Sequence, residues 1–194
     1  MAELSVDDVI QYTGGRLTDN DETQRILDTA LVVARRYCGW HVSPVREDVI
    51  VMDGAGGTEL FPPTRNIVDL TEVLNDGVTL EVGGSGSGAG TPVVVVPASA
   101  PWKLVLTTGR WSTHYSGIEL TLSHGYTEAQ AQDWRHAVLS MVEQMGSTAG
   151  RSDGDLVSKQ VDDVIYRWNT AAEEALYSVK PILDNYELRP VFLA

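Results

Sequence analysis

The chain contains a single cysteine, Cys38, among its 194 residues. A lone cysteine excludes an intramolecular disulfide and a zinc site built from four cysteines. Cys38 follows an apolar stripe with helical spacing and comes directly before Gly39. We therefore expect a packed residue at the end of a helix rather than a nucleophile.

Long apolar runs are also missing. The longest β-branched run, Val93 to Val96, has the length of a strand and falls far short of the roughly 20 residues that span a bilayer. The first residues, Met1 to Asp8, contain neither a basic segment nor an apolar one, so no secretory signal is expected. We expect a soluble protein that is made in a cytoplasm and has no membrane partner.

Basic residues are scarce. The 14 lysines and arginines face 27 aspartates and glutamates, which gives a net charge of -13 and a pI of about 4.5. A field of this sign repels phosphate backbones, so tight sequence-specific binding of nucleic acid is disfavoured. Passage of DNA along the protein without being held is compatible with this charge.

The motifs of common active sites are incomplete. The glycine-rich stretch Gly83 to Gly90 is not followed by the lysine of a phosphate-binding loop. Within it, Gly86 stands where a serine nucleophile would be needed. His136 lies three residues after Asp133 on a predicted helix, and a solvated helix face is the better interpretation of this pair than a metal site. We predict no catalytic residue, no metal and no cofactor.

Apolar residues recur at the helical spacing of three and four in several segments. Ser5 suits the cap of the first helix, and glycines follow the first two helices, where chains commonly leave a helix. The predicted helices are a short one after Ser5 that ends at Gly14-Gly15, Asp21 to Tyr37, Trp134 to Met145, and Val161 to Val179 with Pro181 as its end.

The stretch from Val42 to Tyr126 is rich in glycine, proline and β-branched residues, which indicates short strands and turns. Asp53-Gly54 predicts a hairpin between Val49–Met52 and Thr58–Phe61, and Asn75-Asp76-Gly77 predicts a second one. Ile118, Leu120 and Leu122 alternate with polar residues, as in a half-buried strand.

The order of these segments predicts an α+β fold. It is a small helical bundle of about four helices with a β-rich hairpin insertion between the second and third helices. We expect a single domain over residues 1–194, whose helical core covers about 5–40 and 127–180. The β insertion then covers about 42–126, and a C-terminal tail covers 181–194.

Two apolar features suggest contact surfaces. Trp111 lies in a polar loop between Arg110 and Ser112, and it is the tryptophan that a contact surface could expose. The tail after Pro181 is apolar and aromatic, although chain ends are usually polar. Such a tail either packs on its own domain or docks on a partner.

Four stretches, taken in series, resemble the head-to-tail adaptor (connector) proteins of long-tailed bacteriophages. The resemblance covers most of the chain from Asp21 to Val179, and its Cys-Gly-Trp…Pro-Val segment is the most specific part. The stretches are Arg35 to Val45; Asp48 to Gly54 with Gly57, Leu60 and Pro62; Ile67 to Val73 with Asp76-Gly77; and Ile118 to Leu122 with His124-Gly125-Tyr126.

The resemblance implies a structural virion protein and no catalytic residues. Members of this family form a ring, expected here as a dodecamer, that docks on the portal protein. The ring prolongs the DNA channel and receives the next neck or tail-completion protein, so the chain would be assembled in the host cytoplasm and reside in the neck of the virion. DNA would pass through the lumen without specific binding.

Two sets of residues are assigned to this role as hypotheses. Asp153 and Asp155, in the polar loop Ser147 to Gln160, would face the channel. The apolar tail would dock on the portal through Tyr186, Leu188, Arg189, Pro190, Val191, Phe192 and Leu193.

Two other classes of function stay open. One is a different virion interaction module, such as a tail-completion or decoration protein, with the β insertion and Trp111 carrying the contact. The other is a small metal-dependent or hydrolytic enzyme that uses His114, His124 or His136.

Overall fold

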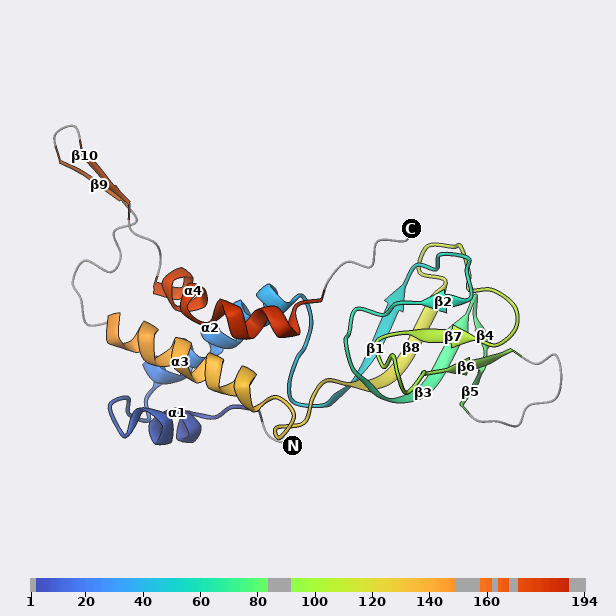
Figure 1. Ribbon diagram of the computed structural model, residues 1–194, viewed down its shortest axis with the longest axis horizontal. Coiled ribbons are helices and arrows are strands. Elements are labelled where there is room, and N and C mark those ends of the chain that lie inside the picture. Colours follow the sequence, from blue (N-terminus) through green and yellow to red (C-terminus); the bar gives the residue numbers. More distant parts are fainter. Residues whose placement is uncertain (1–2, 84–91, 149–157, 162–163, 168–170, 189–194) are drawn as a thin grey trace. The chain divides into compact units, whose positions relative to one another are not determined.

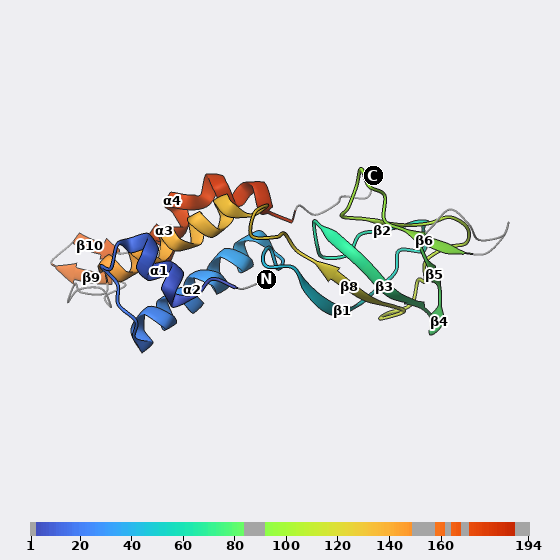
Figure 2. The same cartoon turned by 90° about the horizontal axis from the view of Figure 1, so that it is seen from below.

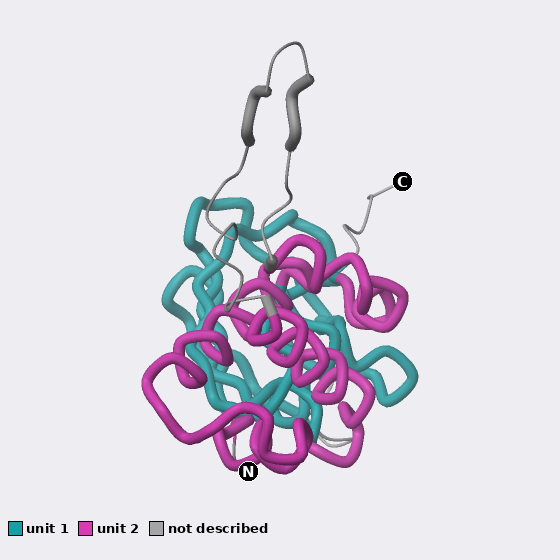
Figure 3. The backbone as a smooth tube through the Cα atoms, turned by 90° about the vertical axis from the view of Figure 1, so that its left-hand side faces the viewer, with its two compact units in different colours: residues 1, 40–127, 188–194 teal, residues 2–39, 128–187 magenta. Residues whose placement is uncertain are grey.

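The computed structural model describes residues 3–83, 92–148, 158–161, 164–167 and 171–188. The chain divides into two compact units, which Figure 3 shows in different colours. The β unit is built on Trp40–Thr127, and the helical unit on Ala2–Gly39 and Glu128–Glu187. The fold is therefore mixed α+β, and the predicted fold class, with about four helices, is confirmed.

The first two helices begin and end where their caps dictate. Helix α1 covers Val6–Thr13 and begins with a reciprocal capping box, in which the Asp8 N–H donates to Ser5 Oγ and the Ser5 N–H donates to Asp8 Oδ2. Helix α2 covers Asp21–Cys38, and Asn20 Oδ1 accepts from the Thr23 N–H at 2.8 Å. Gly39 leaves α2 with φ 78°, a left-handed conformation that glycine adopts without strain.

Helix α3, Gln132–Thr148, is the centre of the helical unit. It contacts α1, α2 and α4, the last of which covers Ala171–Leu183 (Figure 1). Its buried face comes from the predicted stripe and includes Trp134, Val138 and Met141. Cys38 is also fully buried at the end of α2, as predicted. No helix of the described residues is long and apolar enough to cross a membrane.

The predicted helix from Val161 to Val179 is wrong in its first half. Ser158–Val161 (β9) and Val164–Arg167 (β10) form an antiparallel pair, and α4 begins only at Ala171. Val161, Val164 and Ile165 fit a helical spacing, but β-branched residues favour strands, and spacing alone does not separate the two in so short a run.

The β unit consists of two four-stranded sheets that enclose one apolar core. The first sheet has the order β1-β8-β3-β4, and the second has the order β2-β7-β6-β5. Figure 2 shows β1, β8 and β3 side by side. The strands are β1 Arg46–Met52, β2 Glu59–Leu60, β3 Ile67–Asn75, β4 Val78–Thr79, β5 Glu81–Val82, β6 Val93–Val95, β7 Leu104–Leu106 and β8 Ile118–His124.

One of the two predicted hairpins is confirmed. Strands β3 and β4 pair through the two-residue turn Asp76-Gly77, whose φ values of 53° and 75° are those of the turn that Asp-Gly favours. The hairpin predicted at Asp53-Gly54 is wrong, because β1 pairs with β8 and β2 pairs with β7. Gly54 serves another purpose: a Cβ there would lie 1.9 Å from the Ser112 carbonyl oxygen, so only glycine allows this close approach.

Trp111 and Trp102 of the β unit differ sharply in exposure. Trp111 is only 2% exposed, belongs to the core, and donates its indole N–H to the Thr58 carbonyl oxygen at 3.1 Å. The expectation that Trp111 could be exposed at a contact surface is therefore wrong. Its polar neighbours in the sequence mark a loop, but one carbonyl acceptor allows the ring to turn inward. Trp102, by contrast, is 44% exposed.

The buried Trp111 gives a direct test of the core. We expect Trp111→Ala to lower the free energy of unfolding of the β unit by about 3–5 kcal/mol, because it removes a large side chain from a packed interior. The matched variant Trp102→Ala should lower the same free energy of unfolding by about 1 kcal/mol or less, because Trp102 is exposed. Urea unfolding followed by circular dichroism measures both, and equal losses would contradict the buried position of Trp111.

Candidate functional site

The C-terminal end of α4 is fixed by a small polar cluster, which we call the tail root. Tyr37 on α2 donates its hydroxyl hydrogen to Asp184 Oδ1, and Lys180 Nζ donates to the same oxygen at 2.9 Å and to the Tyr37 oxygen. The hydrogen bond to the Asp184 carboxylate raises the pKa of Tyr37 above its ordinary value. Hydrogen bonds to Tyr37 and Asp184 raise the pKa of Lys180, so this cation stays charged.

The proline in α4 does not end the helix, contrary to expectation. α4 continues through Pro181 to Leu183, and a short 3-10 helix follows at Asp184–Tyr186. Proline lacks the N–H that would donate to the carbonyl four residues before it, so the last turn of α4 has one helical hydrogen bond fewer. The extra residues bring Asp184 within reach of Tyr37.

Tyr186 completes the tail root. It is 8% exposed, and its hydroxyl donates to Asp133 Oδ1 at the start of α3. A buried tyrosine needs such a partner for its polar end. Tyr186, one of the residues assigned to portal docking from the sequence, is therefore packed on the helical unit and not exposed for a partner.

The other residues assigned to portal docking come after this anchor in the chain. Leu188 is half-buried, and Arg189, Pro190, Val191, Phe192 and Leu193 lie outside the described residues. Asp153 and Asp155, assigned to the channel, also lie outside them. The nearest described neighbours of these two aspartates in the chain are the end of α3 and strand β9.

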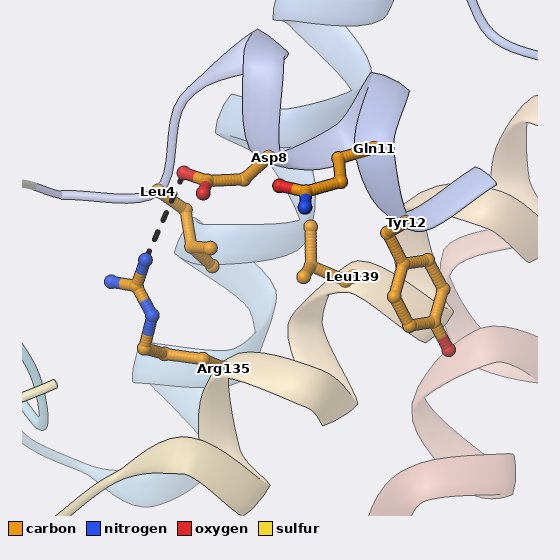
Figure 4. A pocket seen from close by; sticks show the side chains of 6 residues that line it. All are labelled: Leu4, Asp8, Gln11, Tyr12, Arg135 and Leu139. Atoms are coloured by element: carbon orange, nitrogen blue, oxygen red, sulfur yellow. Dashed lines mark ion pairs between the residues drawn. The ribbon is translucent and has the colours of Figure 1, made fainter. Parts of the chain in front are cut away.

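A groove between α1 and α3 was not predicted from the sequence; we call it the α1–α3 groove (Figure 4). Its volume is about 270 Å³, and small-molecule sites usually hold about 300–1,000 Å³. Arg135 and Asp8 form an ion pair across it at 3.7 Å. The groove is therefore smaller than a usual small-molecule site. It is lined by Leu4, Asp8, Gln11, Tyr12, Arg135 and Leu139.

His124 lies in an arrangement that superficially resembles a catalytic triad. Its Nε2 is 2.9 Å from Asp48 Oδ2, and its Nδ1 is 3.1 Å from Thr64 Oγ1. A nucleophile must reach its substrate, yet Thr64 is only 1% exposed and also accepts from the Asn66 N–H. The arrangement therefore joins β8, β1 and the loop before β3, and it is structural.

A second cluster surrounds Asp76. Its Oδ1 accepts from Ser112 Oγ at 2.7 Å and lies 2.9 Å from His114 Nδ1. The hydrogen bonds from Ser112 and then from His114 lower the pKa of Asp76. The Ser112 hydroxyl donates to the carboxylate rather than to the imidazole, and Ser112 is only 6% exposed, so it is not an accessible nucleophile.

The remaining histidines are His136 of the helical unit and His41 of the β unit, whose ring centroid lies 5.9 Å from that of His124. His136 lies edge-to-face against Tyr12 with ring centroids 5.2 Å apart, whereas its predicted companion Asp133 accepts from Tyr186. His41 Nε2 contacts the Pro44 carbonyl oxygen. Within the described ranges, no group of three or more potential ligands is placed to hold a metal ion.

Comparison with solved structures adds to this description. A chain in the neck of a native GTA particle, computed with C12 symmetry, matches with a TM-score of 0.59 at 11% identity, over 96% of this chain and 91% of that chain. This chain has the fold of a particle-neck protein. A chain in the neck of an empty GTA particle, computed with C6 symmetry, matches with a TM-score of 0.54 at 12% identity and the same coverage.

Sequence comparison finds no such likeness. No protein-family model matches the chain, and no curated protein does. The likeness to the two neck chains nevertheless confirms, at the level of the fold, the resemblance inferred from four short stretches.

The hydrogen bonds of Asp48 predict that the stability of the β unit depends on pH. Burial alone would raise the pKa of Asp48, but hydrogen bonds from His124 and the nearby charge of Arg46 outweigh burial and lower it. A lowered pKa means that ionised Asp48 stabilises the fold above the ordinary value of 3.8, and that this stability is lost as the pH falls through and below that value.

We therefore expect Asp48→Asn to destabilise the β unit by about 0.5–1 kcal/mol at neutral pH, a modest loss because the carboxylate is partly exposed. The difference from the unmodified chain should shrink below about pH 4. Urea unfolding at a series of pH values measures it. Asp69→Asn, an exposed residue of β3, is the matched control, and an equal pH-dependent loss in both variants would contradict the assignment.

Proposed function

We propose that this chain is a structural neck protein of a virion. It forms a ring that docks on the portal, extends the DNA channel and connects the head to the tail. The observation that carries the proposal is the fold shared with chains of symmetric particle necks over 91% of their length. No enzymatic role is proposed, since neither histidine cluster has an accessible nucleophile next to a base.

The proposed ring is a dodecamer in which the helical and β units act together as one adaptor domain. Its support is the C12 symmetry of one neck and the C6 symmetry of the other, which is a subgroup of the first. A closed ring of identical chains needs one repeated heterologous contact.

Portal docking is assigned to the tail, residues 188–193, with Tyr186 as its anchor. The support is physical: the tail root holds the start of the segment by bonds from Tyr37, Lys180 and Tyr186. A segment that leaves a fixed root loses less conformational entropy on docking than one that leaves a loose end.

Passage of DNA is assigned to a lumen of acidic character. The net charge of -13 supports a surface that repels phosphates. Asp153 and Asp155 remain the proposed channel-facing residues. No cofactor and no membrane contact is part of the proposal.

A second candidate is another virion interaction module, a tail-completion or decoration protein. Trp111, the residue predicted to carry its contact, is buried, and this weakens the second candidate. The loop before β8 still carries Tyr115, which is 92% exposed and suits a contact with a partner.

Native mass spectrometry of the chain, alone and mixed with the portal from the same genome, tests the proposal. We expect a ring-sized complex that forms only, or far better, with the portal. A persistent monomer that ignores the portal would contradict the adaptor role and favour the second candidate.

A truncated chain that ends at Glu187 serves in the same measurement. It keeps Tyr186 and the tail root, so the helical unit should fold as before, with an unchanged circular dichroism spectrum. Loss of the portal complex is the expected result, and retained attachment would remove the docking assignment.

The channel assignment is tested by the double variant Asp153→Lys, Asp155→Lys in assembled particles. Two cations in place of two carboxylates should hold passing phosphates and slow DNA ejection. The control, Asp19→Lys with Asp28→Lys, makes the same change of charge at exposed positions of the helical unit. Unchanged ejection, or equal slowing by the control, would count against the assignment.

A further inference from the structure

The first sheet of the β unit has a face that no other described strand of this unit covers. Its inner face packs against the second sheet through residues such as Leu120 and Val73. The opposite side, which we call the outer face, consists of three rows across β1, β8 and β3. The rows are Glu47–Ser123–Asp69, Val49–Thr121–Glu72 and Val51–Glu119–Leu74.

The outer face is acidic in every row. It carries the carboxylates of Glu47, Asp69, Glu72 and Glu119, and these three rows contain no lysine or arginine. None of the four carboxylates forms an ion pair with another described residue. Their charge is therefore available to a partner.

The outer face is also apolar at its β1 side. Val49 is 61% exposed and Val51 is 54% exposed. Two β-branched side chains in adjacent rows of one strand make a small continuous apolar strip beside the carboxylates. Such a strip gains free energy when a partner covers it.

Strand β1 is an edge of its sheet. The order β1-β8-β3-β4 leaves one side of its seven residues without a strand partner among the described residues. Proteins usually protect such an edge with a lysine, a proline or a bulge. The first three residues of β1, Arg46 to Asp48, are charged, whereas the stretch from Val49 to Met52 has no charge, proline or bulge, and β1 pairs with β8 in one continuous register.

We propose that the β1 edge and the outer face accept an extended segment of a partner protein in which basic and apolar residues alternate. An added strand would place every second side chain on the outer face, where a lysine stem covers Val49 and Val51 and its ammonium group reaches Glu47 or Glu119. The intervening side chains would lie beside Ile50 and Met52, which are half-buried at the rim of the core and favour apolar neighbours.

The charge decides against a second copy of this chain at the same edge. Two β1 edges paired with each other would bring two outer faces together, each with four carboxylates and no cation in its rows. Such a pairing adds like charge to one continuous sheet and offers no cation to either set of carboxylates. The inference holds whether or not the chain forms a ring.

A peptide of sequence Lys-Val-Lys-Val-Lys-Val-Lys, blocked at both ends, is the probe. It is titrated into the isotope-labelled full chain, and the backbone amide signals are followed by NMR. We expect the changes to concentrate on Arg46–Met52. A peptide of the same composition in blocks, Lys-Lys-Lys-Lys-Val-Val-Val, has the same charge without the alternation and should bind about tenfold more weakly.

The variant Glu47→Lys should weaken binding of the alternating peptide by about fivefold, since it replaces an attraction by a repulsion. Glu81→Lys is the matched control, because Glu81 is also exposed on an edge strand, β5 of the second sheet. Its affinity should stay within about twofold of the unmodified chain.

Four results would overturn the proposal. They are no change at β1, equal changes with the block peptide, equal weakening by both variants, and β1 signals of the free chain that depend on its own concentration. The last result would assign the edge to a second copy of the chain.

Discussion

The β unit depends on strand β8 being paired along its whole length on both sides. Ile118, Leu120 and Leu122 point into the core, and the residues between them must then point to the opposite side of the sheet. β1 and β3 take their register from β8. The same alternation therefore places Glu47 beside Ser123 and Glu72 beside Thr121 on the outer face. The position of these acidic residues on the outer face thus follows from the same alternation that builds the core.

Features with local causes could be predicted from the sequence. The alternation in Ile118 to Leu122 predicts a half-buried strand, and β8 is one. The Asp76-Gly77 turn predicts its hairpin, since both residues tolerate positive φ. Helix α2 is determined by its cap, its stripe and Gly39, and its end at Cys38 lies within one residue of the expected position. Each of these signals lies within a few residues of the structure it determines.

Features that depend on distant residues could not be predicted. Met52 pairs with Ile118 rather than across the nearby Asp53-Gly54 turn, and Gly54 is needed because of Ser112. Trp111 is buried because Thr58 supplies an acceptor. In the tail root, Tyr37 and Asp184 are 147 positions apart in the sequence. The only local signal of this cluster in the sequence is the spacing of four residues between Lys180 and Asp184. The α1–α3 groove gave no sign at all.

The tail root and the outer face suit different kinds of contact. The tail root is a set of directional bonds that holds the start of a short apolar segment, so affinity there depends on the residues beyond Tyr186. The outer face offers exposed charge with an open backbone edge, which speeds encounter and fixes register but adds little affinity for each ion pair. In the proposed roles, the tail contacts one partner and the β1 edge contacts a second, basic partner. Since the carboxylates of the outer face are exposed, the second contact should weaken with salt, whereas the apolar one should not.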